Sequence, residues 1–189
     1  MDKANNPFVT RGFGASASWL DLVNSELWDG FGNFSDMLDD PVWMNGFMKF
    51  WKFRVPTEPA PIREFKALRK LIRYLVQLAE PKGRIPMEQL EMLNEWLRVP
   101  SSMQLVEDQN GLRLAVIPDR GGWQVVLANI VSGFAESLVA LEHKRMKICS
   151  NEDCKWVFVD RTKGNVRRWC NNATCGNRAR VRKARAGRS

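Results

Sequence analysis

The sequence predicts a mainly α-helical N-terminal domain with one β-hairpin, followed by a small cysteine-rich module. Three observations lead to this expectation. Apolar residues recur at three- and four-residue spacing in several segments before residue 144, which is the helical period. Two short runs of partly alternating apolar residues flank Asn110-Gly111, a pair typical of hairpin turns. All four cysteines fall within 27 residues near the C-terminal end. We therefore expect one domain over residues 1–144 and a second over 145–189.

The first two helices are predicted from caps and turns. A helix runs to about Trp28, with Ser16 or Ser18 as its cap, and a glycine-rich turn at 29–33 ends it. A second helical stretch covers residues 35–53. Within it, Pro41 follows an acidic residue that can cap a helix, and proline suits the first helical turn.

Two further helices are predicted from periodicity alone. The segment 62–79 carries apolar residues at three- and four-residue spacing, and Pro81-Lys82-Gly83 ends it. The pattern returns over residues 87–97.

The hairpin and the last helix of the first domain come next. The hairpin pairs residues 103–106 with 112–117, and Gly121-Gly122 forms the following turn. A helix then runs from Trp123 to about Lys144. We interpret the apolar stripes of all these helices as core packing.

Charge is distributed unevenly along the chain. Residues 142–189 hold 14 Lys/Arg and four Asp/Glu, a net charge of +10, whereas residues 1–141 carry −2. This asymmetry favours a polyanionic partner for the C-terminal end.

The chain has no apolar run of the roughly 18–20 residues that a membrane span needs. Its first residues lack a basic region followed by an apolar stretch, so we expect no signal peptide and a cytoplasmic location. Cysteines stay reduced there, and clustered cysteines then favour a metal over disulfides.

The cysteine spacing predicts a zinc site. Cys149 and Cys154 form one pair, Cys170 and Cys175 form a second, and fifteen residues separate the pairs. Zinc prefers four such ligands in a tetrahedron, and four thiolates leave no open position for catalysis. We therefore expect one structural zinc ion. The alternative is two disulfides or free thiols.

The rest of the module reads as a hairpin and a helix. Residues 155–160 are strand-like, 163–165 form a turn, and 166–169 can pair back. Residues 176–185 suit a helix whose start carries the last ligands. This order is treble-clef-like or ribbon-like.

These residues resemble a known family. The segment 149–178 is similar to the CGNR zinc finger, named for four residues that stand here as Cys175, Gly176, Asn177 and Arg178. Phe158 and Asp160 also match, as does the Arg-Arg-Trp-Cys run at 167–170. Thr162 stands where the resemblance leads us to expect serine.

The helices upstream resemble the ABATE domain, which usually precedes this finger. The resemblance rests on residues 19–25, the 62–79 helix and the 127–141 stretch. It implies a stress-induced transcriptional regulator of bacteria that binds DNA.

Basic residues in the finger are the predicted nucleic-acid contacts, because the guanidinium fork of arginine suits phosphates and guanine edges. On a helix, Arg178, Arg182 and Arg185 share one face. The full expected set is Arg167, Arg168, Arg178, Arg180, Arg182, Lys183 and Arg185. Five other residues are expected to support the finger itself: Trp156, Phe158, Asp160, Trp169 and Asn177. Asp160 is expected to pair with Arg167 or Arg168.

Several functions remain open at this stage. The first is a DNA-binding regulator, with duplex DNA as partner, a homodimer as an open option and an effector at the helical domain. The second is a zinc-stabilised adaptor that binds a protein, and the third is an RNA-binding module. We do not expect an enzyme, because the chain has one histidine and no motif that assembles a catalytic set.

Overall fold

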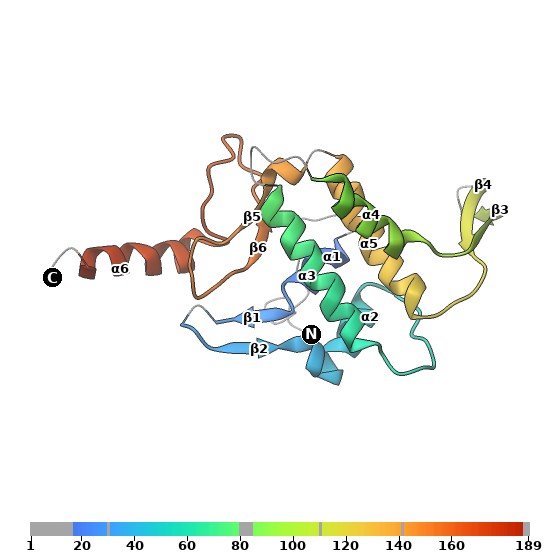
Figure 1. Ribbon diagram of the computed structural model, residues 1–189, viewed down its shortest axis with the longest axis horizontal. Helices are drawn as coiled ribbons and strands as arrows, with labels where there is room; N and C mark the ends of the chain where they lie inside the picture. Colours follow the sequence, from blue (N-terminus) through green and yellow to red (C-terminus); the bar gives the residue numbers. More distant parts are fainter. Residues whose placement is uncertain (1–16, 30, 80–84, 110, 141, 187–189) are drawn as a thin grey trace.

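The computed structural model describes residues 17–29, 31–79, 85–109, 111–140 and 142–186 (Figure 1). The N-terminal elements in chain order are α1 (Ser18–Val23), β1 (Glu26–Trp28), β2 (Phe34–Asp36), the 3-10 turn η1 (Met37–Asp39), α2 (Pro41–Phe50), α3 (Ile62–Leu78), α4 (Met87–Leu97), β3 (Ser101–Asp108), β4 (Gly111–Pro118) and α5 (Trp123–Val139). The C-terminal elements are η2 (Glu142–Arg145), β5 (Met146–Ile148), β6 (Val157–Val159), the π-helical turn η3 (Asn172–Gly176) and α6 (Asn177–Ala186).

Helices and helical turns account for about 51% of the residues that the structure describes. In the described parts, the strands form three separate two-stranded antiparallel sheets. Three features of the sequence prediction lie outside the described residues: the Ser16 cap, the Pro81-Lys82-Gly83 break and the turn residue Asn110.

The core forms around α1, a short helix whose six residues are all buried. Trp19 is fully buried, its ring lies 5.1 Å from that of Phe134 in α5, and its Nε1 donates to Ser137 Oγ at 3.2 Å. Apolar side chains of α3, including Phe65 and Ile72, belong to the same core. A large aromatic centre of this kind stabilises the domain through the apolar area removed from water.

The two helices predicted from periodicity are confirmed. Helix α3 runs over Ile62–Leu78 and α4 over Met87–Leu97. The start of α2 is confirmed as well, because Asp40 caps it by accepting from the Val42 N–H at 2.8 Å and Pro41 takes the first position.

The prediction of continuous helix over residues 16–28 is wrong. Helix α1 ends at Val23, and β1 pairs with β2 across the glycine-rich turn, with Glu26 opposite Asp36. The predicted 35–53 helix is therefore split into β2, η1 and α2. The β1–β2 hairpin forms here because residues distant in sequence bond the polar groups that follow Val23. These groups would otherwise take part in a longer α1.

Arg69 of α3 is the main anchor of the β1–β2 hairpin. Its guanidinium is almost fully buried and donates two bonds to Asp36, at 2.7 and 2.8 Å, and one to Ser25 Oγ. It also lies 3.4 Å from Glu26. Burial raises the pKa of Asp36, but the bonds from Arg69 and Lys66 outweigh it and lower that pKa to about 2. Loss of either partner would leave an unpaired charge buried in the protein. The ion pair therefore fixes the position of the hairpin against α3.

The Asn-Gly hairpin is confirmed and is longer than expected. Strands β3 and β4 pair over eight residues each, from Ser101 opposite Pro118 to Asp108 opposite Gly111. Helix α5 ends at Val139, short of the expected Lys144, and η2 follows as a separate turn. Figure 1 shows the β3–β4 hairpin and α6 at opposite ends of the molecule.

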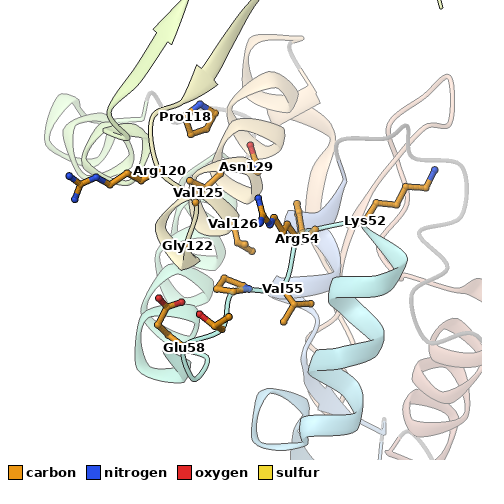
Figure 2. A pocket seen from close by; sticks show the side chains of 14 residues that line it. Lys52, Arg54, Val55, Glu58, Pro118, Arg120, Gly122, Val125, Val126 and Asn129 are labelled. Carbon is orange, nitrogen blue, oxygen red and sulfur yellow. The ribbon is translucent and has the colours of Figure 1, made fainter. Parts of the chain in front are cut away.

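A pocket of about 490 Å³ lies between the loop after α2 and the start of α5 (Figure 2). Arg54 and Val55 line one side, and Gly122, Val126 and Asn129 line the other. Among the described helices, none has both the length and the apolar character that a membrane crossing requires.

Candidate metal centre and its basic helix

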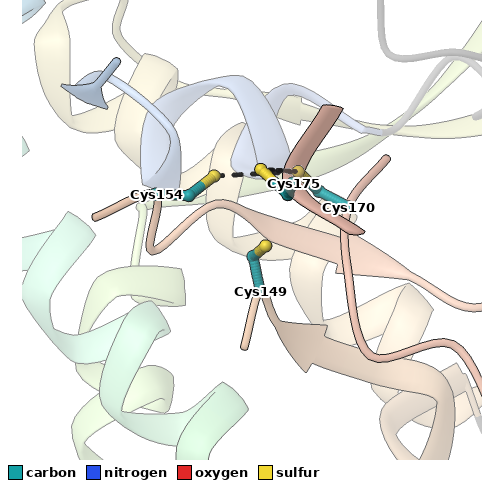
Figure 3. Close-up of side chains that lie close together, drawn as sticks. All are labelled: Cys149, Cys154, Cys170 and Cys175. Carbon is teal, nitrogen blue, oxygen red and sulfur yellow. Dashed lines mark hydrogen bonds between the residues drawn. The ribbon is translucent and has the colours of Figure 1, made fainter. Parts of the chain in front are cut away.

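The four cysteines converge on one point (Figure 3). Their Sγ atoms all lie within 4.8 Å of one another, and the Cys154–Cys170 and Cys170–Cys175 separations are 3.7 and 3.8 Å. A tetrahedral zinc ion with Zn–S bonds of about 2.3 Å has S···S edges of about 3.8 Å. A disulfide needs about 2.05 Å, and all four cysteines are free. The structure thus brings together the expected donor set, with two of its S···S separations at the edge length of a zinc tetrahedron.

The crowding of these thiols favours a cation at their centre. The hydrogen bond with Cys149 and desolvation together raise the pKa of Cys154 to about 12, and hydrogen bonds with Cys149 and Cys154 raise the pKa of Cys170. The same hydrogen bonds lower the pKa of Cys149, so the thiols of this cluster share their protons. Four thiolates can share this volume only around a positive ion, because each added negative charge repels the others. The residues present therefore fit a zinc ion.

Strands β5 and β6 build the scaffold under the first cysteine pair. They pair with Met146 opposite Val159 and Ile148 opposite Val157, and the Cys149 N–H donates to the Trp156 carbonyl at 2.8 Å. The expectation that residues 166–169 pair with this segment is wrong. Met146, Val157 and Val159 are buried in the core of the helical domain, whereas Val166 is exposed, so pairing β6 with β5 buries more apolar surface.

Asp160 is the hub of the loop that links β6 to the second cysteine pair. It is fully buried, and Oδ1 accepts from the Thr162 N–H at 3.0 Å and the Thr162 hydroxyl at 2.6 Å. Oδ2 accepts from the Arg167 N–H at 2.7 Å and from Lys147 Nζ at 2.9 Å. Burial raises the pKa of Asp160, but these bonds outweigh it and hold that pKa well below its usual range. The ion-pair partner is thus Lys147, and Arg167 contributes only its backbone N–H.

Aromatic side chains surround the cysteines, as expected. Phe158 is buried against them, and Trp156 and Trp169 pack there half-buried. A Cβ at Gly176 would clash with Asn172 Oδ1, so the exposed Asn172 side chain would have to shift, and it would lie tight against the Trp169 ring at 3.3 Å.

Asn177 supports the turn before α6. Its Nδ2 donates to the Ala173 carbonyl at 2.7 Å, and its Oδ1 accepts from Arg180. Asn171 caps the same turn by accepting from the N–H groups of Ala173 and Thr174. The side-chain amides thereby fix the direction in which α6 leaves the metal centre.

Helix α6 projects away from the body of the protein (Figure 1). None of its residues is buried, and it carries no acidic residue. Two of its arginines nevertheless turn toward the protein. Arg178 lies over the Phe31 ring at 4.0 Å and donates to the Asp29 carbonyl at 3.0 Å. Arg182 bonds Asp153 at 3.0 Å and Asn151 Oδ1 at 2.5 Å.

The remaining basic residues are divided between support and exposure. Arg167 donates to the Cys170 carbonyl at 2.5 Å and stacks on Phe158, and Arg180 bonds Asn172 and Asn177 at the start of α6. Lys183 and Arg185 are exposed, and neither has a partner among the described residues. Arg168 is exposed and lies 5.4 Å from the Trp169 ring.

Sequence reasoning missed two residues of the centre. Asn151 lies between the first two cysteines, is almost fully buried, and directs Nδ2 at Cys175 Sγ from 3.7 Å. Lys147 lies two residues before Cys149 in an otherwise apolar strand, which is the signal that could have revealed it.

A polar joint connects the finger to the helical domain. The Asn24 side chain is buried and pairs with both backbone groups of Val157, donating at 3.0 Å and accepting at 2.8 Å. Arg73 of α3 donates to the carbonyls of Val23 and Lys155 at 2.6 and 2.7 Å. The finger therefore shares both a core and hydrogen bonds with the helices.

Comparison with known families agrees with this arrangement. Residues 16–141 match the ABATE family model, described as a putative stress-induced transcription regulator, and residues 145–188 match the CGNR zinc finger. A search of curated proteins finds no match.

Proposed function

The chain belongs to the ABATE family, carries a CGNR zinc finger, and from this premise we propose that it is a DNA-binding transcriptional regulator. The observation that carries the proposal is α6, a ten-residue basic helix that projects from a four-cysteine centre. A helix of this length is about 15 Å long and 10–12 Å wide, and the major groove is about 12 Å wide.

The four cysteines hold one structural zinc ion in this proposal. The short turn from Cys149 to Cys154, the β5–β6 pair and the helix that follows the last ligand support a treble-clef-like classification. Four thiolates complete a tetrahedron and leave no open position for a polarised water, which supports a structural rather than an enzymatic role.

The DNA-facing surface is the outer side of α6. Arg178 and Arg182 contact protein groups, so we assign them to orienting the helix on the finger and the β1–β2 hairpin. Lys183 lies on the opposite side of α6 by helical spacing, and Arg185 is exposed at its end. Arg180 bonds Asn172 and Asn177, so we assign it to support of the helix as well. Lys183, Arg185 and Arg168 form a set of three cations for phosphates.

A salt titration tests this assignment. We expect a fluorescein-labelled duplex to bind with log affinity falling against log salt at a slope of about −2.7, since each of three phosphate contacts contributes about −0.9. Fluorescence anisotropy between 50 and 200 mM salt measures the slope. An absence of binding at the lowest salt would refute the proposal.

Matched double variants separate the helix from total charge. Lys183→Ala/Arg185→Ala should reduce the steepness of the slope by about 1.8. Arg63→Ala/Lys70→Ala removes the same charge from exposed positions on α3 and should leave the slope unchanged. Equal effects of the two variants would indicate attraction by net charge alone.

The adaptor remains the second candidate, because part of the arginine face is used within the protein. The contacts of Arg178 and Arg182 leave fewer free cations than the sequence suggested. An adaptor would bind an acidic protein and show no measurable affinity for duplex DNA, and an RNA-binding module would prefer single-stranded RNA in the same anisotropy assay.

We also place an effector site of the helical domain at the pocket beside α5 (Figure 2). Its volume of about 490 Å³ lies in the range of about 300–1,000 Å³ typical of small-molecule sites. Lys52, Arg54 and Arg120 outnumber Glu58 among the charged residues of its walls, which favours an anionic effector. Thermal-shift screening with dicarboxylates and sugar phosphates, compared with Arg54→Ala, tests this assignment.

A further inference from the structure

The β3–β4 hairpin presents an apolar face to solvent. In its register Met103 lies opposite Val116, and Leu105 lies opposite Leu114, so these four side chains project from the same face together with Leu112. All five are between 60% and 70% exposed. No described residue covers them, and the only charge on that face is Glu107 at its margin, opposite Leu112.

The opposite face of the hairpin has a different character. Ser102 and Gln104 bond each other there and are exposed, while Ala115 is buried and Ile117 is half-buried. The hairpin is therefore amphipathic, with its apolar side turned outward. A two-stranded ribbon is marginally stable in water, so a surface of this kind gains by being covered.

We propose that this face binds the same face of a second copy, giving a two-fold homodimer. The Leu105–Leu114 pair lies at the middle of the patch, so a two-fold axis near it places like residues against like. Two sheets stacked about 10 Å apart interdigitate such side chains. An uncharged apolar patch is complementary to itself, and it does not suit nucleic acid or a highly charged partner.

The area agrees with a dimer of moderate affinity. Five such side chains expose about 600 Å², at the upper end of the largest patch found on a typical monomer. Two copies would hide about 1,200 Å², the lower limit for specific interfaces. Formation of this dimer does not depend on DNA binding. Helix α6 lies at the far end of the molecule and would stay free in the dimer (Figure 1).

Sedimentation equilibrium of the zinc-loaded full chain tests the proposal. We expect a reversible dimer in the micromolar range and expect Leu105→Glu/Leu114→Glu to raise the dissociation constant at least about 100-fold, because four like charges would meet in a desolvated patch. The control Ser102→Glu/Gln104→Glu adds the same charge to the other face and should leave the dissociation constant within about twofold of wild type. Circular dichroism melting establishes that both variants are folded.

Hydrogen exchange on the unmutated protein provides a second measurement that does not depend on a variant. Protection of amides in residues 101–118 should rise with protein concentration. A wild-type monomer at every concentration would overturn the proposal and point to a different protein as the occupant. A dimer that persists in Leu105→Glu/Leu114→Glu, or protection independent of concentration, would overturn it as well.

Discussion

Asp160→Asn is the sharpest perturbation of the finger, because the residue accepts four hydrogen bonds and donates none. Each carboxylate oxygen accepts two, one oxygen from Thr162 and the other from Arg167 and Lys147. An asparagine replaces one oxygen with an NH₂ group, which is itself a donor. Whichever way the amide turns, two donors lose their acceptor.

The cost follows from these contacts. Breaking a buried ion pair by removing one partner costs about 3–5 kcal/mol. The Lys147 side chain is 19% exposed, and its Nζ also donates to the carbonyls of Asn165 and Arg167 at 2.6 and 3.1 Å. Because Lys147 keeps these two acceptors in the variant, we expect the loss in the free energy of unfolding to lie near the lower end of that range, at about 3 kcal/mol. For a chain of this size, that corresponds to a fall in Tm of about 6–12 °C.

Calorimetry of zinc-loaded protein at pH 7 measures this loss, and Asp153→Asn is the matched control. Asp153 is in the same finger and pairs with Arg182, but both side chains are over a third exposed, so its replacement should cost at most about 1 kcal/mol. The depressed pKa of Asp160 adds a pH signature. The stabilisation from the Asp160 carboxylate is fully present above the ordinary carboxyl pKa near 4 and is lost as the pH falls toward the lower pKa of the folded state. The difference in Tm between wild type and Asp160→Asn should therefore narrow in acid. A Tm unchanged within 2 °C at pH 7 would refute the hub role.

Three further perturbations follow from the structure. Burial raises the pKa of Asp21 from 3.8 to about 7, although Trp51 donates to it, so the contribution of Asp21 to stability should fall by about 3 kcal/mol as the pH rises from 4 to 7. Asp21→Asn should lose that dependence in urea unfolding, and an unchanged pH profile would contradict the assignment. Asn24→Ala should cost about 2–4 kcal/mol by leaving both backbone groups of Val157 buried without partners, and faster amide exchange at Val157 would report it. Chelation should release one zinc ion per chain and melt α6, because zinc binding contributes on the order of 10–16 kcal/mol to the folding of finger peptides. It should also lower the thermal transition of the helical domain, whose core includes Met146, Val157 and Val159. Circular dichroism and atomic absorption measure this, and a chain without bound metal would contradict the zinc site.

The contribution of local sequence is clearest where neighbouring residues carry the information. The periodicity of residues 62–78 and 87–97 predicted two helices correctly, because a helix is formed by contacts three and four residues apart. Asn110-Gly111 predicted the β3–β4 hairpin correctly, because a tight turn also depends on neighbouring residues. The spacing of the cysteines predicted the donor set, since a metal ion needs only that the chain can bring two close pairs together.

Prediction failed where partners distant in sequence decide the outcome. Glu26–Trp28 became a strand because Asn24 bonds Val157, 133 residues away, and because Arg69 holds Asp36 against it. Likewise, β6 pairs with β5 because that pairing buries more apolar surface in a core that the helices supply.

The use of each arginine was also decided by tertiary structure. Helical spacing placed Arg178 and Arg182 on one face, and this is correct, but it could not show what that face meets. In the folded chain it meets Phe31 and Asp153, from two different parts of the protein. The cysteine cluster and helices α3 and α4 could be predicted from the order of residues alone, because they depend on spacing along the chain. Which strands pair, which cation bonds Asp160 and which basic side chains stay exposed are decided by the tertiary structure. These outcomes depend on which surfaces folding brings within a few ångströms of one another.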